Sequence, residues 1–278
     1  MRVIVADQAG VCFGVKRALD LVYSECERCA SLSTLGPLIH NPQVVGALEA
    51  KGVRVVRRVE DADCAIVLPS HGVPYEVHQA AKDAGLNVID ATCPFVANVH
   101  RRVRSLAAKG FTVVVVGDSD HSEVKAILSA AVENAIVISC AEEVDNYDWS
   151  GKKVGIVSQT TQTGDHFGEV VGKIAANSAQ VMAYNTICYA THERQAAARE
   201  LAPTVEAMFV VGGRNSANTN RLAEICESAG VPTYHIETAS EIDPAWISGM
   251  EVVGLTAGAS TPQWIIDEVK QKLERIGG

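Results

Sequence analysis

Three cysteines are each followed, 28 residues later, by a polar side chain in a similar sequence context. A short apolar run precedes each cysteine, and a segment containing glycine precedes or surrounds each polar residue. One such match could arise by chance, but three matches indicate an internal repeat. The three pairs are Cys12 and His40, Cys93 and His121, and Cys188 and Ser216.

The repeat predicts a metal centre. Equivalent residues of a three-fold repeat lie at equal distances from its axis, so Cys12, Cys93 and Cys188 are expected to converge. Three thiolates suit zinc only if a fourth ligand is added. A cubane iron–sulfur cluster held by three cysteines would instead leave one iron open for substrate. A single cysteine after a strand is often a small buried residue, but the shared spacing favours the metal interpretation.

The other five cysteines lie outside the repeat. Cys26 and Cys29 form a C-x-x-C pair late in a predicted helix, and no second pair of this kind exists to complete a metal site. We interpret this pair as structural, and Cys64, Cys140 and Cys226 as core residues.

A second set of polar residues predicts an anion pocket. His, Ser, Thr and Asn side chains near helix N-termini hold anions, phosphates above all, without many lysines. Histidines without support from the repeat (His78, His100, His166, His192 and His235) are interpreted as ordinary structural residues. The residues of the predicted pocket are His40, His71, His121, Thr160, Thr161, Ser216, Asn218 and Ser260.

Glu123 lies two residues after His121, at the start of a predicted helix. An acid in a first helical turn commonly serves only to favour the helix dipole. A carboxyl beside a convergent site is also a candidate proton donor. Position in the sequence does not decide between these two roles.

Strand-like and helix-like segments alternate along the whole chain. This alternation predicts α/β units with parallel sheets, in which functional side chains lie at the carboxyl ends of strands. The predicted helices are 14–29, 42–51, 74–84, 95–109, 122–131, 165–176, 191–202, 218–229 and 262–276. The predicted strands are 2–6, 53–56, 64–69, 87–90, 112–116, 135–138, 153–158, 180–184, 206–211, 232–236 and 251–256.

The repeat closes on itself, because the cysteine of the last unit is Cys12 at the start of the chain. The predicted units are 13–93, 94–188, and 189–278 together with 1–12. We expect a trilobed, pseudo-three-fold arrangement of three α/β units around a central cluster cavity. Each unit is expected to have a mainly parallel sheet, and the N-terminal strand should complete the third.

Composition narrows the class of protein. The chain has 278 residues, is 47% hydrophobic, and carries a formal net charge of −9, which argues against a nucleic-acid surface. No apolar run is long enough to cross a membrane, and the first residues predict a strand rather than a signal peptide. We therefore expect a cytoplasmic protein whose eight cysteines are thiols or metal ligands rather than disulfides.

Six motifs in combination resemble the IspH (LytB) family of 4-hydroxy-3-methylbut-2-enyl diphosphate reductases. The resemblance extends from the first residues to about Asp267. The motifs are Ala9-Gly10-Val11-Cys12-Phe13-Gly14-Val15, Pro37-Leu38-Ile39-His40-Asn41, Ser70-His71-Gly72-Val73-Pro74, Asp90-Ala91-Thr92-Cys93-Pro94, Thr186-Ile187-Cys188-Tyr189-Ala190-Thr191 and Ala257-Gly258-Ala259-Ser260.

The resemblance implies a trilobed α/β fold and a [4Fe–4S] cluster on Cys12, Cys93 and Cys188 with one open iron. It implies that Glu123 and Thr160 lie near the substrate hydroxyl. The implied diphosphate pocket consists of His40, His71, His121, Ser216, Asn218 and Ser260.

The implied activity is a two-electron reductive dehydroxylation of (E)-4-hydroxy-3-methylbut-2-enyl diphosphate. The allylic alcohol oxygen would bind the open iron, and Glu123 would deliver a proton through Thr160. A ferredoxin or flavodoxin would supply the electrons one at a time. The products would be isopentenyl and dimethylallyl diphosphate, formed in the last step of the methylerythritol phosphate route.

Three positions depart from the pattern usual in that family: Ser122 stands for Pro, Asn185 for Asp, and Ala217 for Ser. A lost hydrogen bond to a charged group is worth about 1.5–3 kcal/mol, so Ala217 is expected to weaken diphosphate binding. Two alternatives are a non-catalytic iron–sulfur paralogue and a zinc-dependent hydrolase of a phosphorylated substrate. Retention of Glu123 and Thr160 argues against the first, and a colourless protein would indicate the second.

Overall fold

The computed structural model describes residues 1–29, 31–131 and 135–277. The chain divides into two compact units. The first contains Met1–Lys16, Ile39–Gly46 and Tyr189–Gly278, and the second contains Arg17–Leu38 and Ala47–Cys188. Within the described residues, no helix has the length and apolarity needed to cross a membrane.

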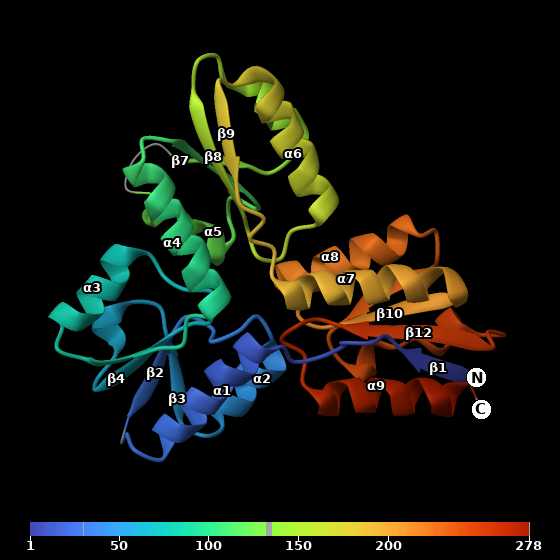
Figure 1. The fold of residues 1–278 in the computed structure, drawn as a ribbon. Helices are drawn as coiled ribbons and strands as arrows, with labels where there is room; N and C mark the ends of the chain where they lie inside the picture. The colour runs from blue at the N-terminus through green and yellow to red at the C-terminus, as the bar shows by residue number, and fades with distance from the viewer. Residues whose placement is uncertain (30, 132–134, 278) are drawn as a thin grey trace. The chain divides into compact units, whose positions relative to one another are not determined.

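The first unit is built on one parallel sheet with the strand order β1-β12-β10-β11. Helix α9 covers one face of this sheet, and helices α7 and α8 cover the other (Figure 1). The strands are β1 (Arg2–Val5), β10 (Ala207–Val211), β11 (Thr233–Ile236) and β12 (Val252–Ala257). The helices are α7 (Tyr189–Leu201), α8 (Ala217–Ser228) and α9 (Gln263–Ile276).

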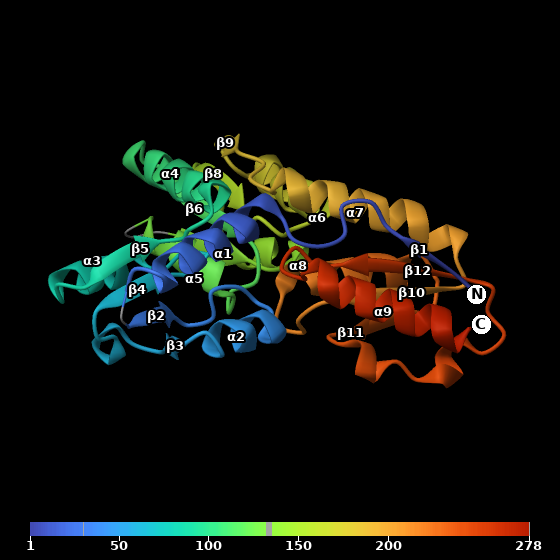
Figure 2. The same cartoon turned by 90° about the horizontal axis from the view of Figure 1, so that it is seen from below.

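The first strand of the chain lies beside the last. β1 pairs in parallel with β12, from Arg2 opposite Val252 to Val5 opposite Leu255. The Met1 ammonium donates a hydrogen bond of 2.9 Å to the carbonyl of Gly277. The two ends of the described chain therefore lie side by side, as Figures 1 and 2 both show.

The second unit contains two further parallel sheets, with the orders β3-β2-β4-β5 and β7-β6-β8-β9. The strands of the first are β2 (Leu32–Leu35), β3 (Val53–Val56), β4 (Ala65–Leu68) and β5 (Asn87–Asp90). Its neighbours in the sequence are helices α1 (Phe13–Cys26), α2 (Pro42–Glu49) and α3 (Tyr75–Asp83), of which α1 and α2 begin in the first unit. The strands of the second are β6 (Thr112–Val116), β7 (Ala135–Ile138), β8 (Lys153–Ser158) and β9 (Gln180–Ala183), with helices α4 (Pro94–Ala108), α5 (Ser122–Ser129) and α6 (Gly164–Asn177).

The sequence explains why these segments form strands and helices. Val113–Val116 is a continuous apolar run that is buried throughout, as expected for a parallel strand covered on both faces. Helix α4 begins with Pro94 at its first position, where the missing N–H costs nothing. The buried residues of α4, among them Val96, Val99 and Val103, recur at helical spacing and form its core-facing stripe.

The three sheets share one topology. Each places its strands in the same order when read from the strand that leads to a cysteine: β5-β4-β2-β3, β9-β8-β6-β7 and β1-β12-β10-β11. The predicted fold class, three α/β units each with a parallel sheet, is confirmed. The unit boundaries at residues 93 and 188 stay a prediction.

Two details of the predicted elements are wrong. Strand β2 was not predicted, yet it is an inner strand of its sheet. Helix α1 ends at Cys26, not at residue 29. The interpretation of Cys64 as a core residue is also wrong, because its side chain is exposed, whereas Cys226 is fully buried.

Candidate active site

Each of the three repeated cysteines stands directly before a helix, at the carboxyl end of a sheet. Cys12 precedes α1, Cys93 precedes α4 and Cys188 precedes α7. In each case the cysteine N–H donates to a carbonyl in the loop that follows the neighbouring strand. The bonds run from Cys12 to Ala259 (3.1 Å), from Cys93 to Ser70 (2.9 Å) and from Cys188 to Thr160 (3.0 Å). The repeat is therefore preserved down to a single hydrogen bond.

The chemistry of these three thiol side chains suits an iron–sulfur cluster. All eight cysteines are thiols, with no disulfide among the described residues, and the three repeated ones are partly exposed. Soft thiolate ligands select iron–sulfur clusters or zinc, and negative charge is favoured at helix N-termini. Within the described chain, no group of three or more His, Cys, Asp or Glu side chains is placed to hold a metal ion. Cys12 belongs to one unit and the other two cysteines to the second, so the convergence of all three stays a prediction.

Two arginines that sequence reasoning missed hold the loops that carry these cysteines. The Arg17 guanidinium donates a 3.2 Å hydrogen bond to the carbonyl of Thr92, one residue before Cys93. Arg194 is only 4% exposed and donates a 2.5 Å hydrogen bond to the carbonyl of Gly10, two residues before Cys12. Arg17 lies five residues after Cys12 and Arg194 six residues after Cys188, but this spacing does not show which distant loop each arginine contacts.

The loop before Cys188 keeps its turn despite one departure from the family pattern. The Asn185 Oδ1 atom accepts a 3.1 Å hydrogen bond from the N–H of Ile187. The equivalent bond in the other loop is accepted by Asp90 Oδ1 from the N–H of Thr92, at 2.9 Å. Asn and Asp both offer this oxygen, so Asn185 preserves the local conformation.

The structure brings Glu123 and Thr160 into direct contact. Thr160 donates to the two carboxyl oxygens of Glu123 from its N–H at 2.7 Å and from its hydroxyl at 2.8 Å. Both residues are buried. Because the Thr160 carbonyl also accepts the Cys188 N–H, one short chain of hydrogen bonds joins the carboxyl group to the cysteine loop.

The environment of Glu123 favours its protonated form. The side chain is 4% exposed, and this burial raises the pKa of Glu123 to about 7. The two hydrogen bonds from Thr160 act in the opposite direction, and the nearby Asp118 raises the pKa further. A carboxyl group with a pKa near 7 is suited to donate a proton at neutral pH.

His121 begins the helix that carries Glu123. Its Nδ1 accepts a 3.1 Å hydrogen bond from the Glu123 N–H, so His121 caps α5. Burial lowers the pKa of His121, although Asp118 opposes this and Lys125 adds to it. The neutral ring then carries its proton on Nε2, since Nδ1 is the acceptor.

Predicted diphosphate ligands of the first unit lie around the start of α8. The Ser260 hydroxyl donates a 3.1 Å hydrogen bond to the carbonyl of His40. A Cβ on Gly213 would come within 2.7 Å of that same carbonyl oxygen, so the loop before α8 packs against His40. Ser216 caps α8 by accepting from the N–H of Thr219.

Asn218 has the strongest sign of a missing ligand in this region. Its side chain is 4% exposed, and neither its Nδ2 nor its Oδ1 has a hydrogen-bond partner among the described residues. Buried amide groups without partners are costly, and a bound diphosphate would supply an acceptor for Nδ2. His40 lies in the first unit, whereas His71, His121 and Thr161 lie in the second, so a shared pocket stays a prediction.

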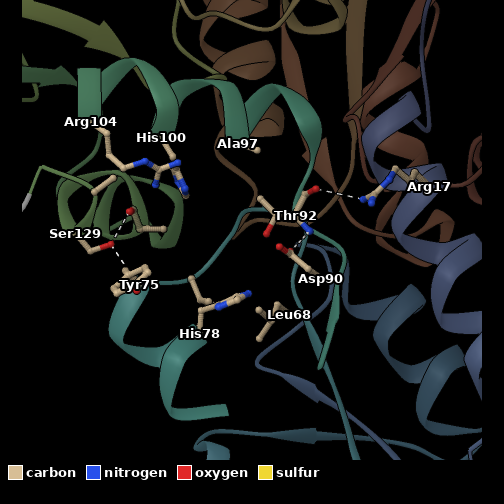
Figure 3. A pocket seen from close by; sticks show the side chains of 13 residues that line it. Arg17, Leu68, Tyr75, His78, Asp90, Thr92, Ala97, His100, Arg104 and Ser129 are labelled. Atoms are coloured by element: carbon tan, nitrogen blue, oxygen red, sulfur yellow. Dashed lines mark hydrogen bonds between the residues drawn. The ribbon is translucent and has the colours of Figure 1, made fainter. Parts of the chain in front are cut away.

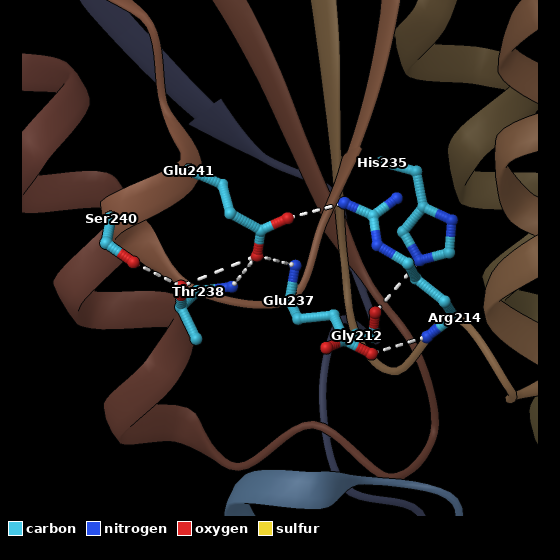
Figure 4. Close-up of polar contacts among 7 residues, drawn as sticks. All are labelled: Gly212, Arg214, His235, Glu237, Thr238, Ser240 and Glu241. Carbon is cyan, nitrogen blue, oxygen red and sulfur yellow. Dashed lines mark hydrogen bonds and ion pairs between the residues drawn. The ribbon is translucent and has the colours of Figure 1, made fainter.

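A polar network fixes the loop that leads to Ser216 (Figure 4). The N–H of Arg214 donates to Glu237, and its guanidinium pairs with Glu241. The second carboxylate oxygen of Glu241 accepts from the N–H groups of Glu237 and Thr238. His235 Nε2 lies 2.9 Å from the carbonyl of Gly212 at the start of the loop.

Comparison with known proteins gives a consistent result over the whole chain. A family model described as LytB protein matches residues 3–274. Two curated relatives, from Pelobacter propionicus and Geobacter sulfurreducens, are 47% and 46% identical to this chain, cover 99% of it, and span 99% and 98% of their own lengths. Both are named 4-hydroxy-3-methylbut-2-enyl diphosphate reductase.

Comparison with solved structures leads to the same family as the sequence matches. One is titled as (E)-4-hydroxy-3-methyl-but-2-enyl diphosphate reductase, the terminal enzyme of the non-mevalonate pathway. It is 42% identical to this chain with a TM-score of 0.70, and the match covers 99% of this chain and 100% of that structure's chain. The reductase from Plasmodium falciparum is 26% identical with a TM-score of 0.93, covering 99% and 87%. The repeated cysteine loops, the Glu123–Thr160 pair and these full-length matches lead to one conclusion: the chain belongs to the LytB family.

Proposed function

We propose that this chain reduces (E)-4-hydroxy-3-methylbut-2-enyl diphosphate to isopentenyl and dimethylallyl diphosphate, the last step of the methylerythritol phosphate route. The reaction consumes two electrons and two protons, breaks the allylic C–O bond and releases water. The observation that carries the proposal is the buried Glu123 carboxyl, which accepts a hydrogen bond from the Thr160 hydroxyl. The chain is also similar over its full length to proteins named 4-hydroxy-3-methylbut-2-enyl diphosphate reductase. A protein that only carries a cluster requires neither residue.

The cofactor we propose is a [4Fe–4S] cluster held by Cys12, Cys93 and Cys188. When bound, it supplies single electrons and one iron without a protein ligand. The chain contributes the equivalent cysteine loops, each tied by its cysteine N–H to a strand loop. Arg17 and Arg194 hold two of these loops in place through backbone carbonyls.

The diphosphate is proposed to bind among His40, His71, His121, Thr161, Ser216, Asn218 and Ser260. Asn218 supports this through its buried, unpartnered amide group, and Ser216 through its place at the N-terminus of α8. Helix N-termini favour phosphate groups. Binding the diphosphate end of the substrate would orient its allylic hydroxyl toward the proton donor. Orientation of this kind is the main contribution of binding groups to such a reaction.

Glu123 is proposed to supply the proton that lets the hydroxyl leave as water. With a pKa of about 7, a substantial fraction of Glu123 is protonated at neutral pH. The Thr160 hydroxyl, 2.8 Å from the carboxyl, can pass the proton on by accepting one hydrogen bond and donating another. A ferredoxin or flavodoxin is the proposed electron donor, and the cytoplasmic location expected from the sequence stays a prediction.

The test is iron and sulfide content with turnover, measured anaerobically with a chemical reductant. The Cys93→Ser protein should lose most of its iron and at least a hundredfold in turnover, because a hydroxyl is a poor substitute for a thiolate ligand. The matched controls, Cys26→Ser and Cys29→Ser, should retain both. Normal iron content in Cys93→Ser would refute the ligand assignment, and a colourless, zinc-containing wild-type protein would refute the reductase.

A further inference from the structure

A cavity lies in the second unit, beside the contact between Arg17 and the Thr92 carbonyl. Its volume is about 480 Å³, within the range of small-molecule sites. It opens at the carboxyl ends of two strands, where Leu68 ends β4 and Asp90 ends β5. Helices α1, α3, α4 and α5 contribute further lining residues (Figure 3). No proposed cluster or diphosphate ligand lines it.

The cavity is locally cationic although the chain carries a net charge of −9. Arg17 and Arg104 line it from two different helices, and Asp90 contributes the one carboxylate among the lining residues of the described chain. One oxygen of Asp90 already accepts from the N–H of Thr92. Guanidinium groups offer several donors to phosphate or carboxylate oxygens.

His100 adds a polar atom that needs a partner. Its Nε2 is buried and makes no hydrogen bond to the described residues. Burial first, and then the charge of Arg104, lower the pKa of His100 to about 4, despite the opposing effect of Asp90. The ring is therefore neutral at physiological pH and can donate one hydrogen bond. Figure 3 shows His100 and Arg104 on α4 and His78 below them on α3.

Part of the remaining wall is formed by small or aliphatic side chains. Leu68, Ala97, Ala126 and Ala130 line the cavity between the polar groups. These side chains can contact a short hydrocarbon body. The Ser129 hydroxyl is already used, since it donates to the Ala126 carbonyl and accepts from the Tyr75 N–H.

We propose that this cavity is a ligand site for a small phosphate monoester with a short apolar body, its phosphate bound by Arg104 with His100 and His78 as further donors. A phosphate suits the site better than a carboxylate because the donors around it outnumber the two oxygens of a carboxylate. The apolar body lies against the alanines of α4 and α5.

Such a ligand would contact the loop that carries Cys93. Thr92 lines the cavity, and its carbonyl accepts from Arg17. Gly72, which follows His71, is also close, because a Cβ there would meet His100 at 3.2 Å. Occupancy of the cavity is thus connected through single contacts to two loops of the proposed active site.

The test is calorimetric titration with 3-methylbutyl phosphate, with 4-methylpentanoate and 3-methylbutanol as carboxylate and neutral probes. The phosphate should bind at least tenfold more tightly than either control. Arg104→Ala should weaken its binding roughly 10- to 100-fold, as expected for loss of a hydrogen bond to a charged group. Arg101→Ala is the matched control: it removes the same charge from α4 at a position that does not line the cavity, and should change binding less than twofold.

Two further variants locate the bound probe. Ala97→Phe fills the cavity and should abolish binding, whereas Asn218→Ala, in the proposed diphosphate site, should leave it unchanged. Loss of binding in Asn218→Ala with retention in Arg104→Ala would place the probe in the active site and overturn the proposal. Absence of phosphate binding to the wild-type holoenzyme at millimolar probe would also overturn it.

Discussion

Glu123 combines two features that oppose each other in most proteins: it is buried, and it is anchored by two hydrogen bonds to its carboxyl oxygens. The bonds from Thr160 would favour the carboxylate, but burial outweighs them and leaves the pKa at about 7. The sequence position alone left open whether this residue favours the helix dipole or donates a proton. The burial supports the second role, because a group that acts only on the dipole has no need to leave solvent.

Replacement of Glu123 by Gln should separate the two roles. Gln keeps the shape and can still bond Thr160, but it carries no acidic proton. We expect normal iron content and diphosphate binding with turnover reduced at least a hundredfold, the loss typical of a positioned general acid. Glu76→Gln, which alters an exposed first-turn acid of α3, should leave turnover within twofold. Near-normal turnover in Glu123→Gln would return Glu123 to a structural role.

The raised pKa of Glu123 also predicts how stability depends on pH. The folded protein holds this proton up to a pKa of about 7, whereas the ordinary value is 4.5. The favourable contribution is therefore fully present below pH 4.5 and is lost as pH rises through 7, by about 3 kcal/mol in total. The difference in urea midpoint between wild type and Glu123→Gln should shift in favour of Gln between pH 5 and pH 8. A difference that is constant over this range would contradict the raised pKa.

At the scale of elements, the loop between β10 and α8 depends on a network of charges for its position. Burial alone would raise the pKa of Glu241, but hydrogen bonds from the Thr238 and Glu237 N–H groups and the Arg214 guanidinium lower it below its ordinary value. Because this carboxylate stays ionised above its depressed pKa, the network persists at neutral pH and weakens only in acid. Its effect is to place Ser216 and Asn218 at the start of α8.

Arg214→Ala should therefore act on binding more than on chemistry. We expect KM for the diphosphate substrate to rise about tenfold, a loss comparable to one charge-assisted hydrogen bond, while kcat changes less than threefold. The control is Arg54→Ala, which removes an exposed pair with Asp63 and should affect neither parameter, because such surface pairs contribute little. A change in kcat alone would show that the network does not serve substrate binding.

The elements themselves differ in how well the sequence predicts them. Long periodic helices and continuous apolar strands such as Val113–Val116 were predicted, because burial on one or both faces leaves a clear pattern. Strand β2 was missed because its two middle residues, Ser33 and Thr34, are polar and yet fully buried. Only the neighbouring strands explain why a segment of this composition lies inside a sheet.

At the scale of the whole molecule, the equal cysteine spacing predicted three units of one topology. The three equivalent cysteine hydrogen bonds follow from the same repeat. The hydrogen bonds from Arg17 and Arg194 to the loops before Cys93 and Cys12 break the three-fold symmetry. No arginine lies five or six residues after Cys93, so the loop before Cys188 has no equivalent contact from such a position. Contacts of this kind depend on residues far apart in the chain, and no local pattern encodes them.

The adjacent chain ends make a whole-molecule prediction. Met1 bonds the carbonyl of Gly277, so a short Gly/Ser linker can join the ends without strain. A circular permutant that begins at the exposed turn residue Gly151 should fold with a melting temperature within about 10 °C of wild type, as such sites usually allow. Measurement by circular dichroism, with a second permutant opened inside buried β8 as the control, tests this. Equal loss of structure in both would contradict it.

The pairing of β1 with β12 has a consequence for the order of events on the ribosome. The N–H of Cys12 bonds the carbonyl of Ala259, and Arg194 bonds Gly10. Cys12 and its loop thus gain these contacts only after the segments that contain Arg194 and Ala259 have been synthesised. A translation product that stops before Arg194 would therefore leave the Cys12 loop without both contacts, however well its other segments had folded.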